Sequence, residues 1–402
     1  MFSDNKFLYK NLFPKENGRE INIYKLTDIK LVGQNLFYPN CFLNKSNNVI
    51  NPINEKIMSL EGVTTKIMSY DNTVTDSVFT TPVFYFVYNT DNYYHFIYDT
   101  LPYLISYNFL KKEIPNIKLL MNYPNEGRNS FYPFVLEFLE LLGIGDKDIV
   151  MVDNKTMYNQ VFISSSYTHG IDSNLPPRKE IYELYRELAL DVKYSSEHIN
   201  TPKKIYISRR SWKHGNFTNI GTNYTTRRKM TNEDELVGLL EFEGYVEVFT
   251  ENMTTKEKVV MFANAEVVIG AIGGGLCNVL FSNPTTKVIP LISPTFLDVN
   301  KRFIYSFSKV NVKYFTDTNH TSNDTFKKYM RVKSNDLVGE IIEVLDDYIV
   351  INYSKNFVAG WNNQVMFETL KLKKKECIPL DRGLNSEWVL NINSFKEHLL
   401  NS

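Results

Sequence analysis

A histidine and an aspartate four positions apart could act together on a proton. His95 and Asp99 come shortly after an apolar run at residues 83–88. On a helix, two residues at this spacing share one face, and the carboxylate fixes the imidazole tautomer and stabilises its protonated form. Such a pair can take a proton from a hydroxyl group. The alternative is structural, with Asp91 or Asn92 capping a helix and His95 as a hydrogen-bonded packing residue.

A glycine-rich turn follows a second apolar run at residues 267–269. Gly273, Gly274 and Gly275 let the backbone pass close to a ligand and enter a short helix that contains Asn278. The N–H groups and the positive dipole end at a helix start can hold a diphosphate. Because the glycines are contiguous and no acidic residue follows about 20 positions on, a nicotinamide dinucleotide is not expected. The alternative is a turn whose glycines only allow tight packing.

Arginines at two places could bind phosphate oxygens. Arg209 and Arg210 follow a strand expected at residues 204–208, and Arg228 precedes a helix expected at residues 233–241. Guanidinium groups make forked contacts to phosphate and do not lose their charge, so they could take the place of a metal ion. Surface ion pairs are the alternative, which we favour for Arg210.

The composition indicates a soluble globular protein and argues against one that binds nucleic acid or membranes through its overall charge. The 402 residues include 45 basic and 45 acidic ones, so no overall charge attracts nucleic acid or an anionic membrane. A hydrophobic share of 43% is typical of a soluble globular protein, and the length fits two domains. The three cysteines do not indicate a disulfide framework. Without a leader-like start or a membrane-spanning stretch, a cytoplasmic location is predicted.

Alternating strands and helices should position these groups, which indicates an α/β fold with parallel sheets covered on both faces. Two doubly wound, Rossmann-like domains are predicted at residues 76–200 and 201–345, with extensions at 1–75 and 346–402. The expected helices lie at residues 92–112, interrupted at Pro102, and at 131–142, 177–190, 233–241 and 335–345. Asn232 and Glu235 have the spacing of a helix-capping box, and the basic run 371–375 is expected to be a solvated face.

In chain order these motifs resemble glycosyltransferase family 61, which includes protein O-GlcNAc transferases, plant arabinoxylan xylosyltransferases and capsule-type bacterial enzymes. The resemblance lies in N-x-x-H-x-x-x-D at residues 92–99, I-S-R at 207–209, R-R-K-M-T-N-E-D-E-L at 227–236 and V-V-I-G-A-x-G-x-G-L-x-N at 267–278. It implies a GT-B architecture with two domains facing a cleft. It also implies a nucleotide-sugar donor on the second domain, inversion at the anomeric carbon and little need for a metal. UDP-xylose and UDP-GlcNAc are the donors it suggests.

The residues and the resemblance together predict an in-line displacement on a glycan or glycoprotein acceptor. His95 is expected to act as base or acceptor binder, oriented by Asp99; alternatively, Asp99 itself is the base. The leaving diphosphate would be stabilised by N–H groups and guanidinium groups. The residues expected to bind the donor are Arg209, Arg228, Thr250, Glu251, Gly273, Gly274, Gly275 and Asn278.

One position departs from the family pattern, because Ile272 stands where the family usually has histidine. Altered donor choice or loss of activity therefore stays open. The alternatives to a transferase are a sugar-nucleotide or glycan binder without turnover and a polysaccharide pyruvyltransferase that uses phosphoenolpyruvate. Asp146-Lys147-Asp148 matches the D-x-D of metal-dependent enzymes, but it lies between a helix end and a strand, so we expect a turn and no metal site.

Overall fold

The computed structural model describes most of the chain. The described residues are 7–31, 42–43, 49–50, 75–86, 92–123, 129–153, 155–168, 175–195, 199–210, 229–294, 301–320, 326, 328, 331–335, 337–353, 368–381 and 387–401. The chain forms two compact units, the first mainly from Met1–Val192 and the second from most of the remainder. Within the described part, every helix is too short or too polar to span a lipid bilayer.

The first unit contains a mixed sheet in the order β4-β3-β2-β9-β6-β7-β8, with β1 beside β2 and β5 beside β9. Strands β9, β6, β7 and β8 are parallel, whereas β2 runs antiparallel to β9. The strands are β1 (Leu8–Glu16), β2 (Arg19–Leu31), β3 (Phe42–Leu43), β4 (Val49–Ile50), β5 (Ser77–Phe79), β6 (Val83–Tyr85), β7 (Lys118–Met121), β8 (Ile149–Met151) and β9 (Thr156–Ser164). The expected parallel sheet therefore carries antiparallel strands, contributed by residues assigned to an N-terminal extension.

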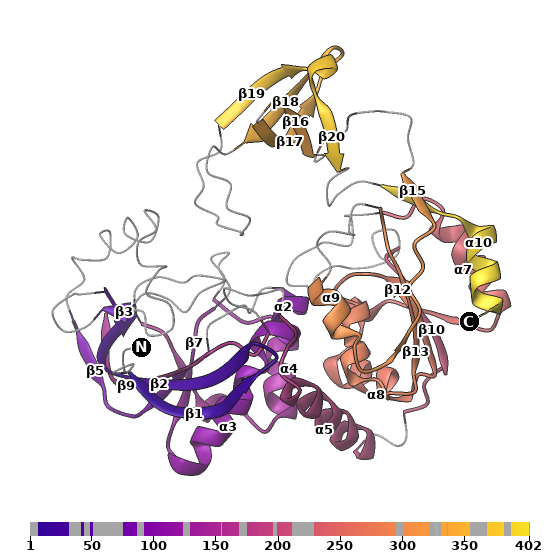
Figure 1. The fold of residues 1–402 in the computed structure, drawn as a ribbon. Coiled ribbons are helices and arrows are strands. Elements are labelled where there is room, and N and C mark those ends of the chain that lie inside the picture. Colours follow the sequence, from indigo (N-terminus) through magenta and orange to yellow (C-terminus); the bar gives the residue numbers. More distant parts are fainter. Residues whose placement is uncertain are drawn as a thin grey trace. The chain divides into compact units, whose positions relative to one another are not determined.

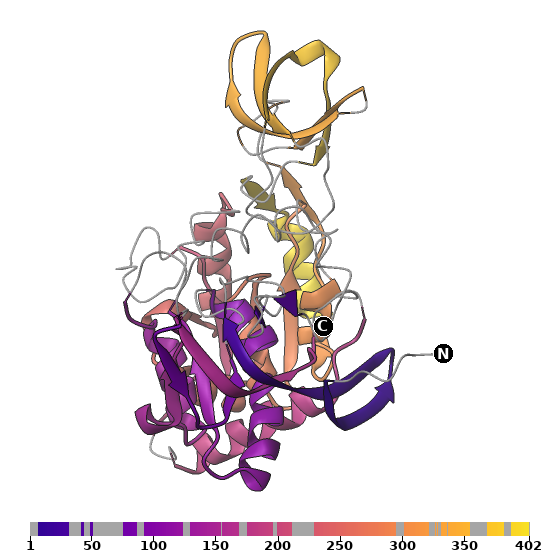
Figure 2. The same cartoon turned by 90° about the vertical axis from the view of Figure 1, so that its left-hand side faces the viewer.

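The hairpin of β1 and β2 explains this difference (Figure 2). Asn17 and Gly18 connect its strands, and both have positive φ angles, 52° and 84°. Two residues of this type match the twist of a hairpin, so the dipeptide Asn17-Gly18 is the signal for it in the sequence.

Helices follow the parallel strands of the first unit. They are α2 (Tyr93–His95), the π-helix η2 (Phe96–Thr100), α3 (Tyr103–Glu113), α4 (Pro133–Leu141), the 3-10 turn η3 (Asp146–Asp148) and α5 (Glu180–Tyr194). The interruption expected at Pro102 is confirmed, because proline cannot donate a backbone hydrogen bond and Leu101 N–H reaches back five residues to the Phe96 carbonyl, at 2.8 Å.

The second unit is built on a parallel sheet in the order β11-β10-β12-β13-β14 (Figure 1). Its strands are β10 (Lys204–Ile207), β11 (Val246–Val248), β12 (Val267–Ala271), β13 (Lys287–Leu291) and β14 (Asn311–Val312). Numbered along the chain, this order is 2-1-3-4-5, in which the direction of winding reverses between β10 and β12. Ligands of such sheets bind at the carboxyl ends of the strands at this reversal.

Helices cover both faces of the second sheet. Figure 1 shows α7 (Glu233–Phe242) and α10 (Ile392–Leu400) on one face and α8 (Thr255–Asn264) and α9 (Lys301–Ser306) on the other. Leu236 and Leu240 of α7 and Phe395 of α10 share one core with Ile269 and Ile289 of the sheet. The C-terminal helix is therefore part of the packing of this sheet.

An antiparallel sheet with its own core lies between β14 and α10 in the chain, in the order β19-β18-β17-β16-β20. Figure 2 shows that it is strongly curved. Its strands are β16 (Arg331–Ser334), β17 (Leu337–Val344), β18 (Tyr348–Tyr353), β19 (Glu368–Lys373) and β20 (Ile378–Asp381); β15 (Thr318–His320) pairs with β21 (Trp388–Leu390) separately. The basic run 371–375 begins on β19 and is mostly exposed, as expected of a solvated face.

The helix predicted at residues 335–345 is wrong. Asn335, with a φ of 54°, turns the chain, and β17 follows as a strand paired with β16 and β18. Gly339 and Ile341 are buried while Val338 and Glu340 are exposed, a period-2 pattern typical of a half-buried strand. The predicted domain boundary at 345/346 falls between two hydrogen-bonded neighbours of this sheet.

Candidate active site

The His95–Asp99 pair lies where α2 passes into the π-helix η2. Nδ1 of His95 is 2.7 Å from Oδ2 of Asp99, whose side chain is 0% exposed, while the His95 side chain is 22% exposed. An ionised carboxylate can only accept, so the proton of a neutral His95 ring stays on Nδ1. Nε2 is then the basic nitrogen of the pair.

Thr168 completes the hydrogen bonds of Asp99. Its Oγ1 donates to Oδ1 of Asp99 at 2.8 Å, and both residues are buried. Asp99 follows β6, and Thr168 follows β9, the parallel neighbour of β6. Their side chains meet because the carboxyl ends of adjacent parallel strands lie at one edge of the sheet. Nothing in the local sequence predicts this contact between residues 69 positions apart.

The glycine turn lies at the reversal point of the second sheet, where β10 and β12 are parallel neighbours. A methyl group added at Gly273 would lie 2.7 Å from Nη1 of Arg209, and one at Gly275 would lie 2.7 Å from Oγ1 of Thr250. Because glycine has no side chain, Arg209 can lie against Gly273 and Thr250 can lie against Gly275. Arg209, Thr250 and the turn come from the ends of three adjacent strands.

The short helix expected after the turn is present as a 3-10 helix, η5 (Leu276–Phe281). Asn278 is buried and donates its side-chain amide to the Gly275 carbonyl at 2.8 Å, so it braces the turn. Among the residues that the structure describes, no acceptor receives a hydrogen bond from the N–H groups of Gly273, Gly274 and Gly275. The turn thus has backbone N–H groups that could donate to a ligand.

Glu233, the first residue of α7, accepts three hydrogen bonds from residues at the end of β10. Its Oε1 accepts from the Arg209 backbone N–H at 2.7 Å, the Tyr206 hydroxyl at 2.9 Å and the Ser208 hydroxyl at 3.1 Å. Burial raises the pKa of the Glu233 carboxyl, which is 3% exposed. Burial also lowers the pKa of Arg209, which nevertheless stays charged.

Asn232 precedes α7, but its side chain does not cap the helix as predicted. It donates to the Leu390 carbonyl and accepts from the Leu390 N–H of β21 instead. Pairing with a strand that is distant in the chain has replaced the local cap.

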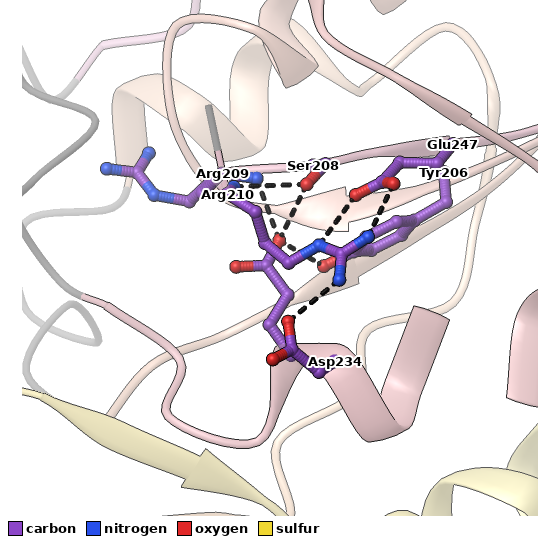
Figure 3. A network of polar contacts seen from close by, with 7 residues as sticks. Tyr206, Ser208, Arg209, Arg210, Asp234 and Glu247 are labelled. Atoms are coloured by element: carbon purple, nitrogen blue, oxygen red, sulfur yellow. Dashed lines mark hydrogen bonds and ion pairs between the residues drawn. The ribbon is translucent and has the colours of Figure 1, made fainter. Parts of the chain in front are cut away.

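Arg210 forms ion pairs, as favoured from its sequence context. Its guanidinium makes a two-pronged contact to Glu247, at 2.9 and 2.6 Å, and a contact of 2.7 Å to Asp234. The hydrogen bond to Glu247 is the main reason that the pKa of Arg210 lies above its usual value. Figure 3 shows the Arg209 side chain extending away from this network. Adjacent arginines therefore have different surroundings.

The family model described as Glycosyltransferase 61 matches residues 93–289. This segment of the chain belongs to glycosyltransferase family 61. The matched segment begins at the His95–Asp99 pair and runs through the glycine turn into β13, so the groups described above lie within the glycosyltransferase domain. No curated protein matches the sequence significantly.

The remaining predicted residues of this family 61 enzyme fall in three places. Glu251 lies after β11 in the 3-10 turn η4 (Thr250–Asn252), and its Oε1 is buried without a hydrogen-bond partner among the described residues. Ile272 is buried, and its N–H donates to the Leu291 carbonyl at 3.2 Å. Arg228 lies outside the described residues.

The Asp146-Lys147-Asp148 motif is a turn, as expected. It forms η3, and Asp148 accepts from Lys111 at 2.6 Å and from the Gly145 N–H at 3.3 Å. In the described part of the chain, no group of three or more histidine, cysteine, aspartate or glutamate side chains is arranged to hold a metal ion.

Replacing Glu233 by glutamine should change how stability depends on pH. Because burial raises the pKa of Glu233 above its ordinary value of 4.5, the folded state binds this proton more tightly than the unfolded chain. Its contribution to stability is full below pH 4.5 and is lost as the pH rises through the raised pKa. Glutamine does not ionise but keeps an acceptor oxygen for all three donors. In urea unfolding, Glu233→Gln should therefore gain stability relative to the wild type as the pH rises from acid to neutral.

Glu233→Ala is the matched control. It removes the acceptor of three buried or partly buried donors, which costs about 3 kcal/mol of unfolding free energy at every pH. Equal pH dependence in the wild type and Glu233→Gln would contradict a raised pKa for this carboxyl.

Proposed function

We propose that this enzyme transfers a sugar from a nucleoside-diphosphate donor to a hydroxyl group of a glycan or glycoprotein, with inversion at the anomeric carbon. The observation that carries the proposal is the glycine turn at the reversal point of the second sheet. Three N–H groups without acceptors among the described residues stand there beside the Arg209 guanidinium. Backbone N–H groups and arginine are the usual protein ligands of a diphosphate, and both oppose the negative charge that grows on it as it leaves.

Glu251 supports a nucleoside next to this diphosphate site. In doubly wound sheets, an acidic residue after the second strand accepts hydrogen bonds from ribose hydroxyls. Strand β11 holds that position in the order 2-1-3-4-5, and Glu251 follows it with a buried oxygen that has no partner among the described residues. We assign Glu251 to the ribose of the donor. UDP-xylose and UDP-GlcNAc are the first donors to test.

His95 is the proposed general base. Nε2 takes the proton of the acceptor hydroxyl, whose oxygen bonds to the anomeric carbon while the bond from that carbon to the diphosphate breaks. Asp99 is less suited to this role, because it is fully buried and both its oxygens are already engaged, Oδ2 with His95 and Oδ1 with Thr168. We assign the acceptor to the first unit and the donor to the second, as in a GT-B enzyme.

A thermal-shift screen followed by a transfer assay tests the proposal. UDP-sugars should raise the melting temperature more than GDP-, CMP- or dTDP-sugars, with a gain of about 2.7 kcal/mol at one hundred times Kd. Transfer with release of UDP should then follow when an acceptor is present, and EDTA should not affect it. Binding without release under any acceptor would support a non-catalytic binder. A response to phosphoenolpyruvate and to no uridine nucleotide would support a pyruvyltransferase.

Replacing Gly273 by alanine should weaken UDP binding about tenfold, equivalent to 1.4 kcal/mol. The added methyl group would lie 2.7 Å from Nη1 of Arg209, so the guanidinium must leave the turn. Because a side-chain end can move, the fold should survive, and calorimetric titration with UDP measures the effect. Gly238→Ala is the control: nothing lies within 4 Å of its added methyl group, so it should leave UDP affinity unchanged and stabilise α7 by about 0.5–1 kcal/mol. A folded Gly273→Ala with wild-type affinity would contradict the proposed contact.

A further inference from the structure

The carboxylate of Asp99 is held from two sides in the interior of the first unit. Nδ1 of His95 lies 2.7 Å from Oδ2 of the carboxylate, and the Thr168 hydroxyl donates to Oδ1 at 2.8 Å. Asp99 is 0% exposed and Thr168 is 1% exposed, so water does not readily replace the hydroxyl. A carboxylate bonded at both oxygens has a fixed plane, and its Oδ2 is directed at Nδ1 of the imidazole.

Thr168 is itself held by Arg19, which begins β2. Arg19 Nη2 donates to the Thr168 carbonyl at 2.6 Å and to the Leu175 carbonyl at 3.1 Å, and Nε donates to the Pro176 carbonyl at 2.7 Å. The guanidinium is buried, so these carbonyls replace its water. Arg19 lies outside the segment that matches the family model.

We infer that Thr168 is a positioning residue for the His95–Asp99 pair, and that Arg19 holds the backbone of Thr168 in place through its carbonyl. The Thr168 hydroxyl orients the carboxylate and stabilises its negative charge, and the carboxylate in turn directs the imidazole. The inference rests on the proposed role of His95 as base. It assigns a part in catalysis to the N-terminal hairpin, which carries no catalytic motif.

Thr168→Val tests the inference because it removes the hydroxyl at nearly constant volume, and Thr168→Ser is the matched control that keeps it. In Thr168→Val, kcat should fall about tenfold while UDP affinity stays unchanged. The acidic limb of the kcat/KM profile should also move to higher pH. Asp99 without its donor is a less stable anion, so the pair holds its shared proton more tightly. Tyr103, which interacts electrostatically with both Asp99 and Arg19, stays in place, and so does Arg19. Thr168→Ser should restore both the rate and the profile.

Imidazole resonances of the nitrogen-15-labelled protein give a readout that does not depend on activity. The His95 signals, assigned by their loss in His95→Asn, should shift in Thr168→Val and return in Thr168→Ser. If the His95 signals shift in Thr168→Val but the rate of sugar transfer does not change, Thr168 positions the imidazole and His95 is not the base. Unchanged signals and an unchanged pH profile in a folded Thr168→Val would overturn the inference. Arg19→Lys keeps the charge but loses the planar fork of N–H donors that contacts these carbonyls, so it should shift the signals in the same direction.

Discussion

Replacing His95 by asparagine is expected to lower the rate of sugar transfer by a factor of about 100 to 10,000, the usual contribution of a general base. The asparagine amide can still donate to Oδ2 of Asp99, but it has no basic nitrogen to take the proton of the acceptor. The loss should therefore appear in kcat, measured as UDP released under saturating donor and acceptor.

The response of the melting temperature to UDP should be unchanged in His95→Asn, because the diphosphate site is made by residues of the second unit. Asp99→Asn separates the two assignments of the base. If His95 is the base, this variant keeps the basic ring but loses the carboxylate that fixes its tautomer and stabilises its protonated form, so both variants should lose activity. A large loss in Asp99→Asn combined with a small loss in His95→Asn would make Asp99 the base.

Replacing Arg209 by methionine should weaken UDP binding about 10- to 100-fold, the range for a charge-assisted hydrogen bond to phosphate. The side chain lies against Gly273, and its backbone N–H is fixed by Glu233 at 2.7 Å. Its position is therefore set before any ligand arrives, and calorimetric titration with UDP measures what it contributes. Arg209→Lys keeps the charge but loses the planar fork, so its affinity should be intermediate.

Arg210→Met is the control from the adjacent position. Its guanidinium is already bonded to Glu247 and Asp234, so the variant should lose about 1 kcal/mol of stability and leave UDP affinity unchanged. Equal losses of affinity in the two methionine variants would show that general positive charge, and not the placement of Arg209, binds the nucleotide.

Strands and helices with strong local signals could be predicted from the sequence. Apolar runs such as β10, β12 and β13 are buried on both faces, and such runs are typical of parallel strands between two layers of helices. Pro102 predicts the break in the helix that carries His95 and Asp99, because its effect is confined to neighbouring turns. The α/β class follows from these local features.

Elements whose form depends on distant partners could not be predicted in the same way. Residues 335–345 are predicted as a helix, but β17 forms a strand there because it pairs with β16 and β18. Asn232 is predicted to cap α7, but its side chain forms hydrogen bonds to Leu390, 158 positions away, instead. In both cases contacts across the fold outweigh a weak local preference.

The residue pattern alone determined that His95 and Asp99 can form a pair and that glycines follow the strand ending at Ala271, because spacing along a helix and backbone freedom are properties of a few adjacent residues. Only the tertiary structure decided that Thr168 and Arg19 support the pair, that Glu233 accepts hydrogen bonds from three donors, and that the Arg209 guanidinium lies against Gly273. These contacts join residues on neighbouring strands and on the segments that follow them. They exist only once the strands have paired and brought their carboxyl ends to one edge of each sheet.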